Sequence, residues 1–216
     1  MRSVYGKFSM ANTGMTSPDG TNLSHPVADL PTLRCMLVFV GLMGAGKSAI
    51  GRRVAQRLGV PFTDADAEIE AAAGCTIAEI FEHDGEAVFR AGERRVIKRL
   101  LDGPPGVLST GGGAFMDPAT REAVRDRGLS IWLRADLDTL VERTRRRSNR
   151  PLLAEGDPRE TLARLMAVRD PIYAEADLTI ETGHLPADQT AHAVLDALRS
   201  FRATDGSIDR PAARGA

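Results

Sequence analysis

The stretch GLMGAGKS at residues 41–48 follows the strongly apolar run CMLVFVG at 35–41 and precedes a segment with helical periodicity. It matches the pattern G-x-x-x-x-G-K-[ST] in the strand–turn–helix context that this pattern requires. A run that is apolar at almost every position predicts a central strand covered on both faces. Apolar residues then recur every four positions from Ile50 to Leu58, which predicts a helix. This order predicts a strand and a helix joined by a tight glycine turn, as in α/β proteins.

Short apolar runs alternate with helical patterns through the rest of the chain. A capping box at 76–79 opens one predicted helix, and residues 186–202 form the last one. Strands that alternate with helices imply βαβ units, so we predict an α/β fold with a parallel sheet. The predicted strands after the first are 60–64, 106–110, 129–135 and 177–181.

The chain of 216 residues is long enough for one domain of ordinary size. Residues 1–33 are rich in Ser, Thr, Asn, Gly and Pro and have no sustained period, so we predict a flexible leader. Residues 202–216 have a similar composition and are predicted to be a flexible tail. The folded domain is therefore expected over residues 34–201.

Charge, hydropathy and cysteine content exclude several classes of function. The formal net charge of −1 argues against binding nucleic acid by bulk charge. No apolar run approaches the roughly 20 residues that span a bilayer, and the N-terminus lacks the apolar core of a secretory signal. Cys35 and Cys75 lack metal-ligand spacing and are interpreted as inert thiols in a reducing cytoplasm. We expect a cytoplasmic monomer without a nucleic-acid or membrane partner.

The glycine turn has the composition of a phosphate-binding loop. Its glycines allow backbone N–H groups to approach phosphates, and the N-terminus of the following helix adds a favourable dipole. Lys47 is predicted to reach the β- and γ-phosphates of a nucleoside triphosphate, and the Ser48 hydroxyl to ligate Mg²⁺. A chance match to a glycine-rich turn is the alternative, which the register of strand, motif and helix disfavours. The predicted ATP contacts of this loop are Gly44, Ala45, Gly46, Lys47, Ser48 and Ala49.

Two aspartates, Asp64 and Asp66, stand one residue apart at the end of the second predicted strand. Alternate side chains of a strand share a face, so both carboxylates are expected to point the same way. The alternative is a solvated strand end with Asp66 as the N-cap of a helix. Beside a phosphate loop, Asp64 is predicted to serve Mg²⁺ through water. Asp66 is predicted to orient or deprotonate an attacking hydroxyl.

Three glycines, Gly111, Gly112 and Gly113, follow the third predicted strand, at the edge where α/β proteins bind ligands. Consecutive glycines let main-chain N–H groups contact a small molecule, but a loose strand–helix connection has the same composition. Arg90 lies on a predicted helix and Arg169 near a helix end. Taken alone, each of them is an ordinary solvated arginine.

A basic cluster in RTRRRSNRPLLAEGDP stands before a loop that contains proline and glycine. The near-neutral chain and the lack of interleaved aromatic residues oppose a nucleic-acid tract. A mobile lid that brings guanidinium groups onto phosphates fits better, with about two of the arginines acting. The cluster consists of Arg143, Arg145, Arg146, Arg147 and Arg150.

Together these segments resemble shikimate kinase. The resemblance covers about residues 36–199, and other small-molecule kinases share the phosphate loop but not the GEAVFR, GGG and RPLL segments together. It implies the nucleoside-monophosphate-kinase type of P-loop fold, with three layers, a five-stranded parallel sheet flanked by helices, and a lid segment. In chain order, the matching segments are GLMGAGKSAIGRRVAQRLG, FTDADAEIE, TIAEIFEHDGEAVFRAGE, VLSTGGGAF, NRPLL and LMAVRDPIY.

The resemblance also implies an ATP:shikimate 3-phosphotransferase of aromatic amino-acid biosynthesis that uses Mg²⁺. Arg90 and Arg169 would hold the carboxylate of shikimate, and Asp66 would meet the hydroxyl that is phosphorylated. Arg150 would come from the lid onto ATP, opposite Lys47, so that Lys47, Asp66 and Arg150 are the predicted catalytic residues. The residues assigned to shikimate are Asp66, Arg90, Gly111, Gly112, Gly113 and Arg169, and those assigned to the metal are Ser48 and Asp64.

Two positions depart from the family pattern. Ala49 stands where the family often has threonine, and we expect little effect because Ser48 is present. The segment ETGHLPAD lacks the arginine that the family often carries near the adenine site, which leaves His184 or the main chain for the base contact.

Two other functions share some of these features. A different small-acceptor kinase, such as a gluconate kinase, has the phosphate loop but does not require two arginines for a carboxylate. A nucleotide-binding switch without kinase activity is the second alternative, and the presence of Lys47, Ser48, Asp64 and Asp66 argues against it.

Overall fold

A five-stranded, fully parallel sheet forms the centre of the molecule, with the strand order β3-β4-β2-β5-β6. The computed structural model describes residues 31–145, 157–183, 185–201 and 207–209. All five predicted strands and the parallel sheet are confirmed. The strands are β2 (Met36–Val40), β3 (Phe62–Asp64), β4 (Val107–Ser109), β5 (Gly128–Arg134) and β6 (Leu178–Glu181).

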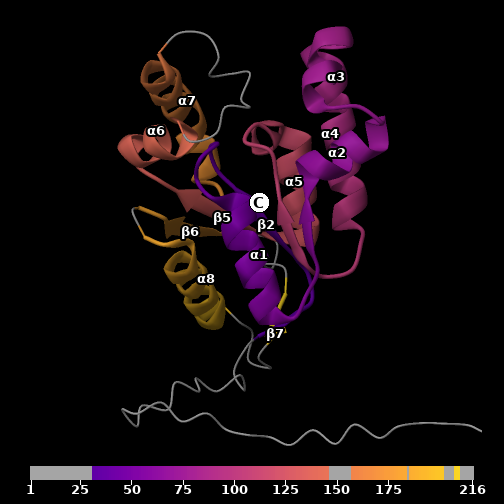
Figure 1. Ribbon diagram of the computed structural model, residues 1–216. Helices are drawn as coiled ribbons and strands as arrows, with labels where there is room; N and C mark the ends of the chain where they lie inside the picture. The colour runs from indigo at the N-terminus through magenta and orange to yellow at the C-terminus, as the bar shows by residue number, and fades with distance from the viewer. Residues whose placement is uncertain (1–30, 146–156, 184, 202–206, 210–216) are drawn as a thin grey trace, which may run out of the picture.

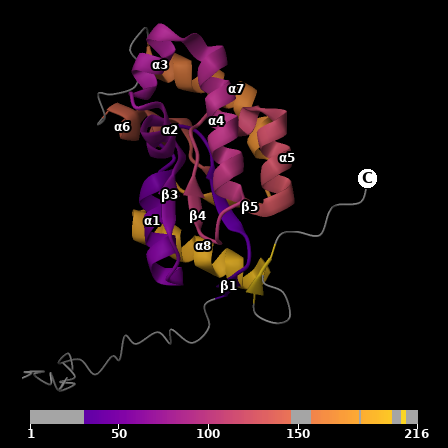
Figure 2. The ribbon, with the colours of Figure 1, turned by 90° about the vertical axis from the view of Figure 1, so that its right-hand side faces the viewer.

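Helices cover both faces of this sheet and complete three layers (Figure 1). Turned by a quarter, the molecule shows α1 on one side of the sheet and α5 on the other, with α4 beside α5 (Figure 2). The predicted α/β fold is therefore confirmed. The helices are α1 (Lys47–Leu58), α2 (Ala65–Ala73), α3 (Ile77–His83), α4 (Gly85–Leu101), α5 (Pro118–Arg127), α6 (Leu137–Arg145), α7 (Pro158–Tyr173) and α8 (Ala187–Phe201), with the short 3₁₀ turn η2 (Ala114–Met116).

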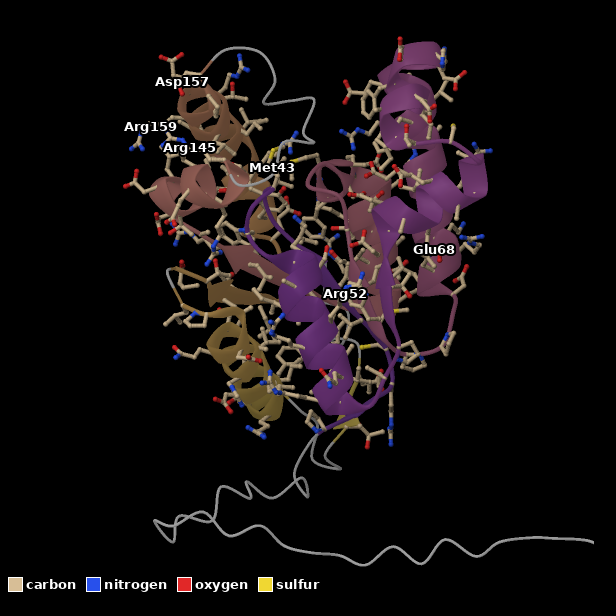
Figure 3. The ribbon with its side chains drawn as sticks, viewed as in Figure 1. Met43, Arg52, Glu68, Arg145, Asp157 and Arg159 are labelled. Carbon is tan, nitrogen blue, oxygen red and sulfur yellow. The ribbon has the colours of Figure 1, made fainter. Side chains whose placement is uncertain are left out.

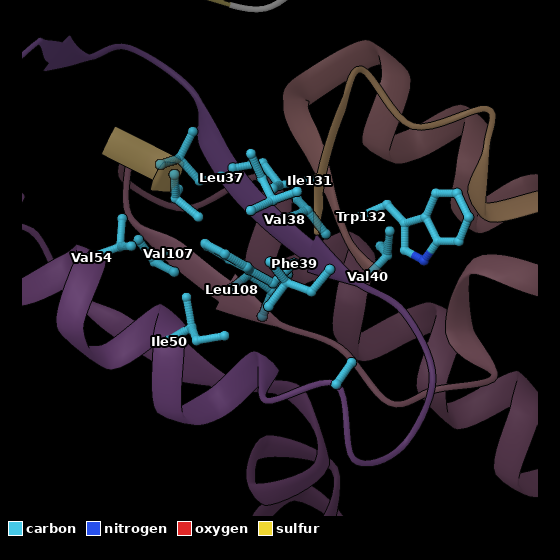
Figure 4. Close-up of a cluster of buried hydrophobic side chains, with 14 of the residues drawn as sticks. Leu37, Val38, Phe39, Val40, Ile50, Val54, Val107, Leu108, Ile131 and Trp132 are labelled. Atoms are coloured by element: carbon cyan, nitrogen blue, oxygen red, sulfur yellow. The ribbon is translucent and has the colours of Figure 1, made fainter. Parts of the chain in front are cut away.

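The core lies around β2, the central strand. Residues 37–40 have no exposed surface, which explains why this run is apolar at every position. Val54 of α1 and Val107 and Leu108 of β4 pack in the same cluster (Figure 4). This packing fixes the end of β2, and with it the start of the glycine loop. Within the described ranges, every helix is too short or too polar to cross a bilayer.

The end of β3 differs from the prediction. The strand stops at Asp64, and Ala65 already begins α2, so Asp64 and Asp66 do not alternate along one strand. The alternative with Asp66 as N-cap is also wrong. Asp64 caps the helix, because its Oδ1 accepts a hydrogen bond from the backbone N–H of Asp66 at 3.1 Å. The predicted capping box that opens α3 is confirmed at Thr76 and Glu79.

A second sheet corrects the predicted boundaries of the domain. Strands β1 (Thr32–Leu33) and β7 (Ser207–Ile208) pair in parallel, and Ile208 has no exposed surface. The flexible leader and tail were predicted to include these four residues, so the prediction is wrong for them. Two-residue strands are too short to produce a periodic pattern, and an isolated isoleucine among polar residues gives no sequence signal. Residues 1–30, 202–206 and 210–216 lie outside the described ranges.

Candidate active site

The phosphate loop follows the carboxyl end of β2 and enters α1 through Gly46. This residue caps the helix with a φ of 95°, a left-handed conformation that glycine adopts without strain. Gly41, where the loop begins, has a φ of 133°, and a Cβ there would lie 2.6 Å from the carbonyl oxygen of Leu133. The motif therefore needs glycine at these positions for backbone geometry as well as for ligand access.

Lys47 is folded over its own loop. Its Nζ donates hydrogen bonds to the carbonyl oxygens of Gly41 at 2.7 Å and Leu42 at 3.0 Å, and the residue is 9% exposed. Lys47 also stands at the first position of α1, where backbone N–H groups have no partner within the helix. A cation and a helix N-terminus thus face the same place, and this combination favours a phosphate.

A group of oxygen atoms lies where the ends of β3 and β4 meet the start of α1. The Ser48 hydroxyl donates to Asp64 Oδ2 at 2.7 Å, and its oxygen is 3.2 Å from Ser109 Oγ. Asp64 and Ser109 are neighbours in the register of the two strands. Oxygen ligands are those that Mg²⁺ prefers, and this ion commonly uses one or two protein carboxylates together with phosphates. Sequence reasoning missed Ser109, although its place at the end of a strand beside the phosphate loop could have indicated it.

The glycine run at 111–113 brings the predicted acceptor residues together. A Cβ on Gly111 would lie 2.8 Å from Asp66 Oδ1, and one on Gly113 would lie 2.6 Å from two nitrogens of Arg90. Arg169 donates from Nη1 to the carbonyl oxygen of Gly112 at 3.1 Å. Two guanidinium groups and a carboxylate from three different helices therefore meet at one short segment of main chain.

Arg90 is held in place by a buried acid that the sequence analysis missed. Its Nη1 donates to Glu93 Oε2 at 2.6 Å, and Glu93 is only 2% exposed. Burial raises the pKa of Glu93, and the hydrogen bond and charge of Arg90 offset part of that rise. Burial alone would lower the pKa of Arg90, but its bonds to Glu93 and Glu86 raise it overall. The sequence did carry a signal for this pair, because an acid three residues after an arginine on a helix lies next to it.

An open cleft of about 1180 Å³ runs along the phosphate loop. Met43 of the loop lies between two groups of helices, one formed by α6 and α7 and the other by α2 to α5 (Figure 3). One end of the cleft reaches Asp66, Gly111 and Gly112. Arg90 and Arg169 adjoin this end through Gly113 and Gly112 but do not form part of the cleft wall. The cleft is large enough for a nucleotide and a small acceptor placed end to end.

The other end of the cleft is lined by Arg143, Leu185, Ala187 and Thr190. Arg143 is fixed there, since its Nη2 donates to the carbonyl oxygen of Gly183 at 2.6 Å. An apolar wall beside a planar guanidinium suits the flat face of a nucleotide base. From the sequence, Arg143 was predicted only as a member of the basic cluster. The other predicted contacts in this region, Arg150 on the phosphates and His184 at the base, lie outside the described residues, as do Arg146 and Arg147.

Comparison with known proteins gives a consistent result. A family model described as shikimate kinase matches residues 43–199. The shikimate kinase of Paramagnetospirillum magneticum is 57% identical over 165 residues, which cover 76% of this chain and 85% of that protein. The shikimate kinase of Mesorhizobium japonicum is 49% identical over 94% of this chain and 98% of its own length.

Solved structures agree with these relatives. Shikimate kinase from Acinetobacter baumannii in complex with shikimate is 40% identical, with a TM-score of 0.76, and the match covers 81% of this chain and 98% of that chain. A gluconokinase from Sinorhizobium meliloti 1021 is 20% identical, with a TM-score of 0.50, and the match covers 77% and 94% of the two chains. At this identity, the match to the gluconokinase shows only that the two proteins share a fold.

Proposed function

Because this chain belongs to the shikimate kinase family, we propose that it transfers the γ-phosphoryl group of ATP to the 3-hydroxyl of shikimate. The observation that carries this proposal is the meeting of Asp66, Arg90 and Arg169 at the glycine run, at one end of the cleft that follows the phosphate loop. A cleft with a phosphate site along it and two guanidinium groups adjoining one end suits a phosphorylated acid, the product of this reaction.

In this proposal, ATP lies along the loop with its base toward Arg143 and Leu185. Lys47 leaves the carbonyl oxygens of Gly41 and Leu42 and contacts the β- and γ-phosphates. Its positive charge and the N-terminus of α1 stabilise the charge that develops on the phosphoryl oxygens. By family resemblance, Arg150 adds a second positive charge from the opposite side.

Mg²⁺ would be held by Ser48 and, through water, by Asp64. The oxygen atoms at this place fit such an ion in kind, and the ion would neutralise negative charge on the phosphates during transfer. Asp64 is already oriented for this role, since one carboxylate oxygen accepts from Ser48 and the other from the N–H of Asp66.

Arg90 and Arg169 are proposed to grip the carboxylate of shikimate. A guanidinium offers two parallel N–H groups that match a carboxylate, whereas an ammonium acts as a point charge. Glu93 is buried and holds Arg90 in one orientation through their hydrogen bond. Asp66 then faces the hydroxyl that attacks, orients it and accepts its proton as transfer proceeds. Catalysis in this account is mostly positioning and charge neutralisation.

The substitution Arg90→Lys tests the carboxylate grip. We expect the KM for shikimate to rise about 10- to 100-fold, because a hydrogen bond to a charged group contributes about 1.5–3 kcal/mol. The KM for ATP should remain near that of the wild type. Arg99→Lys is the matched control, since Arg99 lies on the same helix but is exposed and pairs with Glu68. An unchanged KM for shikimate in a folded Arg90→Lys variant would remove Arg90 from the site.

Turnover with three acceptors tests the function itself. Release of ADP, measured in a coupled assay, should be fast with shikimate and slow or absent with quinate and gluconate. Faster release with gluconate would favour the alternative small-acceptor kinase. Binding of ATP with no ADP release for any of the three acids would favour a nucleotide-binding switch.

A further inference from the structure

The carbonyl oxygen of Gly112 accepts two hydrogen bonds, and both come from α7. One donor is Nη1 of Arg169 at 3.1 Å, and the other is the hydroxyl of Tyr173. A carbonyl oxygen has two lone pairs, so these two donors occupy both of them. Residues four positions apart on a helix share a face, and they therefore reach the glycine run side by side. α7 is thus tied to the acceptor end of the cleft at Gly112.

Tyr173 is the more rigid of the two donors. It has no exposed surface, and its ring stacks between Phe115 and Trp132 at centroid distances of 6.4 and 5.9 Å. Burial strongly raises its pKa, so the hydroxyl keeps its proton and acts as a donor at neutral pH. Arg169 is only half-buried and has a long, flexible side chain. The fully buried hydroxyl and the half-buried guanidinium share one acceptor atom.

We propose that Tyr173 is a positioning residue for Arg169 in the binding of the acceptor carboxylate. Its hydroxyl holds the Gly112 carbonyl at the place where that carbonyl receives Arg169 Nη1. The guanidinium has five N–H donors, and this bond uses one of them and fixes the plane of the group. The guanidinium can then present its other N–H groups to a carboxylate in one orientation.

The glycine run is the reason why such a fixed donor is needed. The backbone of glycine has more conformational freedom than the backbone of any other residue, and three glycines follow one another here. Without the Tyr173 hydroxyl, the Gly112 peptide can rotate and Arg169 loses a fixed anchor. Binding of the carboxylate must then order both groups, which weakens affinity for the acceptor. Affinity for ATP does not depend on this contact.

The substitution Tyr173→Phe removes the hydroxyl and keeps the ring stack. We expect the KM for shikimate to rise roughly five- to tenfold, the usual effect of losing one neutral hydrogen bond. The KM for ATP and the kcat at saturating shikimate should stay within about twofold of the wild type. Ser130→Ala is the matched control, because it also removes a hydroxyl from a well-buried residue, one that bonds Asp177 away from the cleft. It should lower thermal stability without changing either KM.

A double-mutant cycle separates positioning from general packing. On an Arg169→Lys background, Tyr173→Phe should raise the KM for shikimate less than about twofold further, because residues that act as a unit are not additive. Replacement of Tyr173 by p-aminophenylalanine restores a donor on the same ring and should return the KM close to the wild-type value. If Tyr173→Phe does not fold, p-fluorophenylalanine at this position carries the test, because it keeps the ring and removes the donor: a raised KM for shikimate in the folded protein supports the proposal, and a wild-type KM overturns it.

Three results would overturn the role of Tyr173: an unchanged KM for shikimate in folded Tyr173→Phe, equal rises in the KM values for shikimate and ATP, or full additivity with Arg169→Lys. The inference rests on the proposed function, and the wild type tests that function separately. A wild type that does not phosphorylate shikimate overturns both. A wild type that does, with an unaffected Tyr173→Phe variant, overturns only the role of Tyr173.

Discussion

Replacing Lys47 with methionine is expected to lower kcat by about 10³-fold, because removal of one group that stabilises transition-state charge typically costs 10²- to 10³-fold and Lys47 carries a full charge. Methionine has nearly the length of lysine and retains the apolar stem, so the main loss is the ammonium group. In the ligand-free protein this group is bonded to the carbonyl oxygens of Gly41 and Leu42. The loop therefore already holds the charge where the phosphates would arrive.

Steady-state kinetics of the Lys47→Met variant, with thermal unfolding to confirm that it folds, measures this effect. Lys98→Met is the matched control, since Lys98 is an exposed lysine in the last turn of α4 and its loss should change kcat less than twofold. A Lys47→Met variant that retains more than about a tenth of wild-type kcat would contradict the assignment, as it would leave this ammonium with little part in the transition state.

The second large effect is expected from Asp66→Asn. Asparagine keeps the shape and a hydrogen-bond acceptor but removes the charge that favours loss of the proton from the attacking hydroxyl. Loss of a general base typically costs about 10²- to 10⁴-fold in turnover. The loose transition state of phosphoryl transfer requires little early deprotonation, so we expect the lower end of this range. The affinities for ATP and Mg²⁺ should barely change.

Asp64→Asn is the matched comparison, because the two aspartates stand one residue apart and have different partners. Asp64 contacts Ser48 and caps α2, whereas Asp66 lies against Gly111. Asp64→Asn should raise the Mg²⁺ concentration needed for half-maximal rate. Titrations of Mg²⁺ and shikimate with both variants distinguish the two roles. The same pattern in both variants, or an Asp66→Asn variant that shifts only the Mg²⁺ requirement, would show that the division of roles is wrong.

The fold was predictable because each of its main elements carries its own local signal. The residues of β2 are apolar at consecutive positions since helices cover both faces of that strand, and the loop GLMGAGKS specifies a turn between a strand and a helix. The small sheet of β1 and β7 had no such signal. Its two strands are only two residues long and stand far apart in the sequence, at Thr32–Leu33 and Ser207–Ile208, so only tertiary packing specifies the pair.

The site residues that belong to a sequence motif could be predicted, whereas the buried residues behind them could not. Lys47 and Ser48 follow from the loop pattern alone. Glu93 bonds Arg90, and Tyr173 bonds the same carbonyl as Arg169, both from buried positions. In the sequence they look like an ordinary helical acid and an ordinary core aromatic. The strand rule misplaced Asp66 because the helix begins one residue after Asp64, and a helix start cannot be located to one residue from periodicity.

The most direct test of the account is a crystal structure of this protein with Mg²⁺, ADP and shikimate bound together. The account predicts the diphosphate over the glycine loop, with shikimate at the glycine run 111–113. Its carboxylate should lie within about 3.2 Å of nitrogen atoms of both Arg90 and Arg169, and its 3-hydroxyl should face Asp66. Shikimate bound with its carboxylate away from both arginines, or with a different hydroxyl at Asp66, would contradict the account.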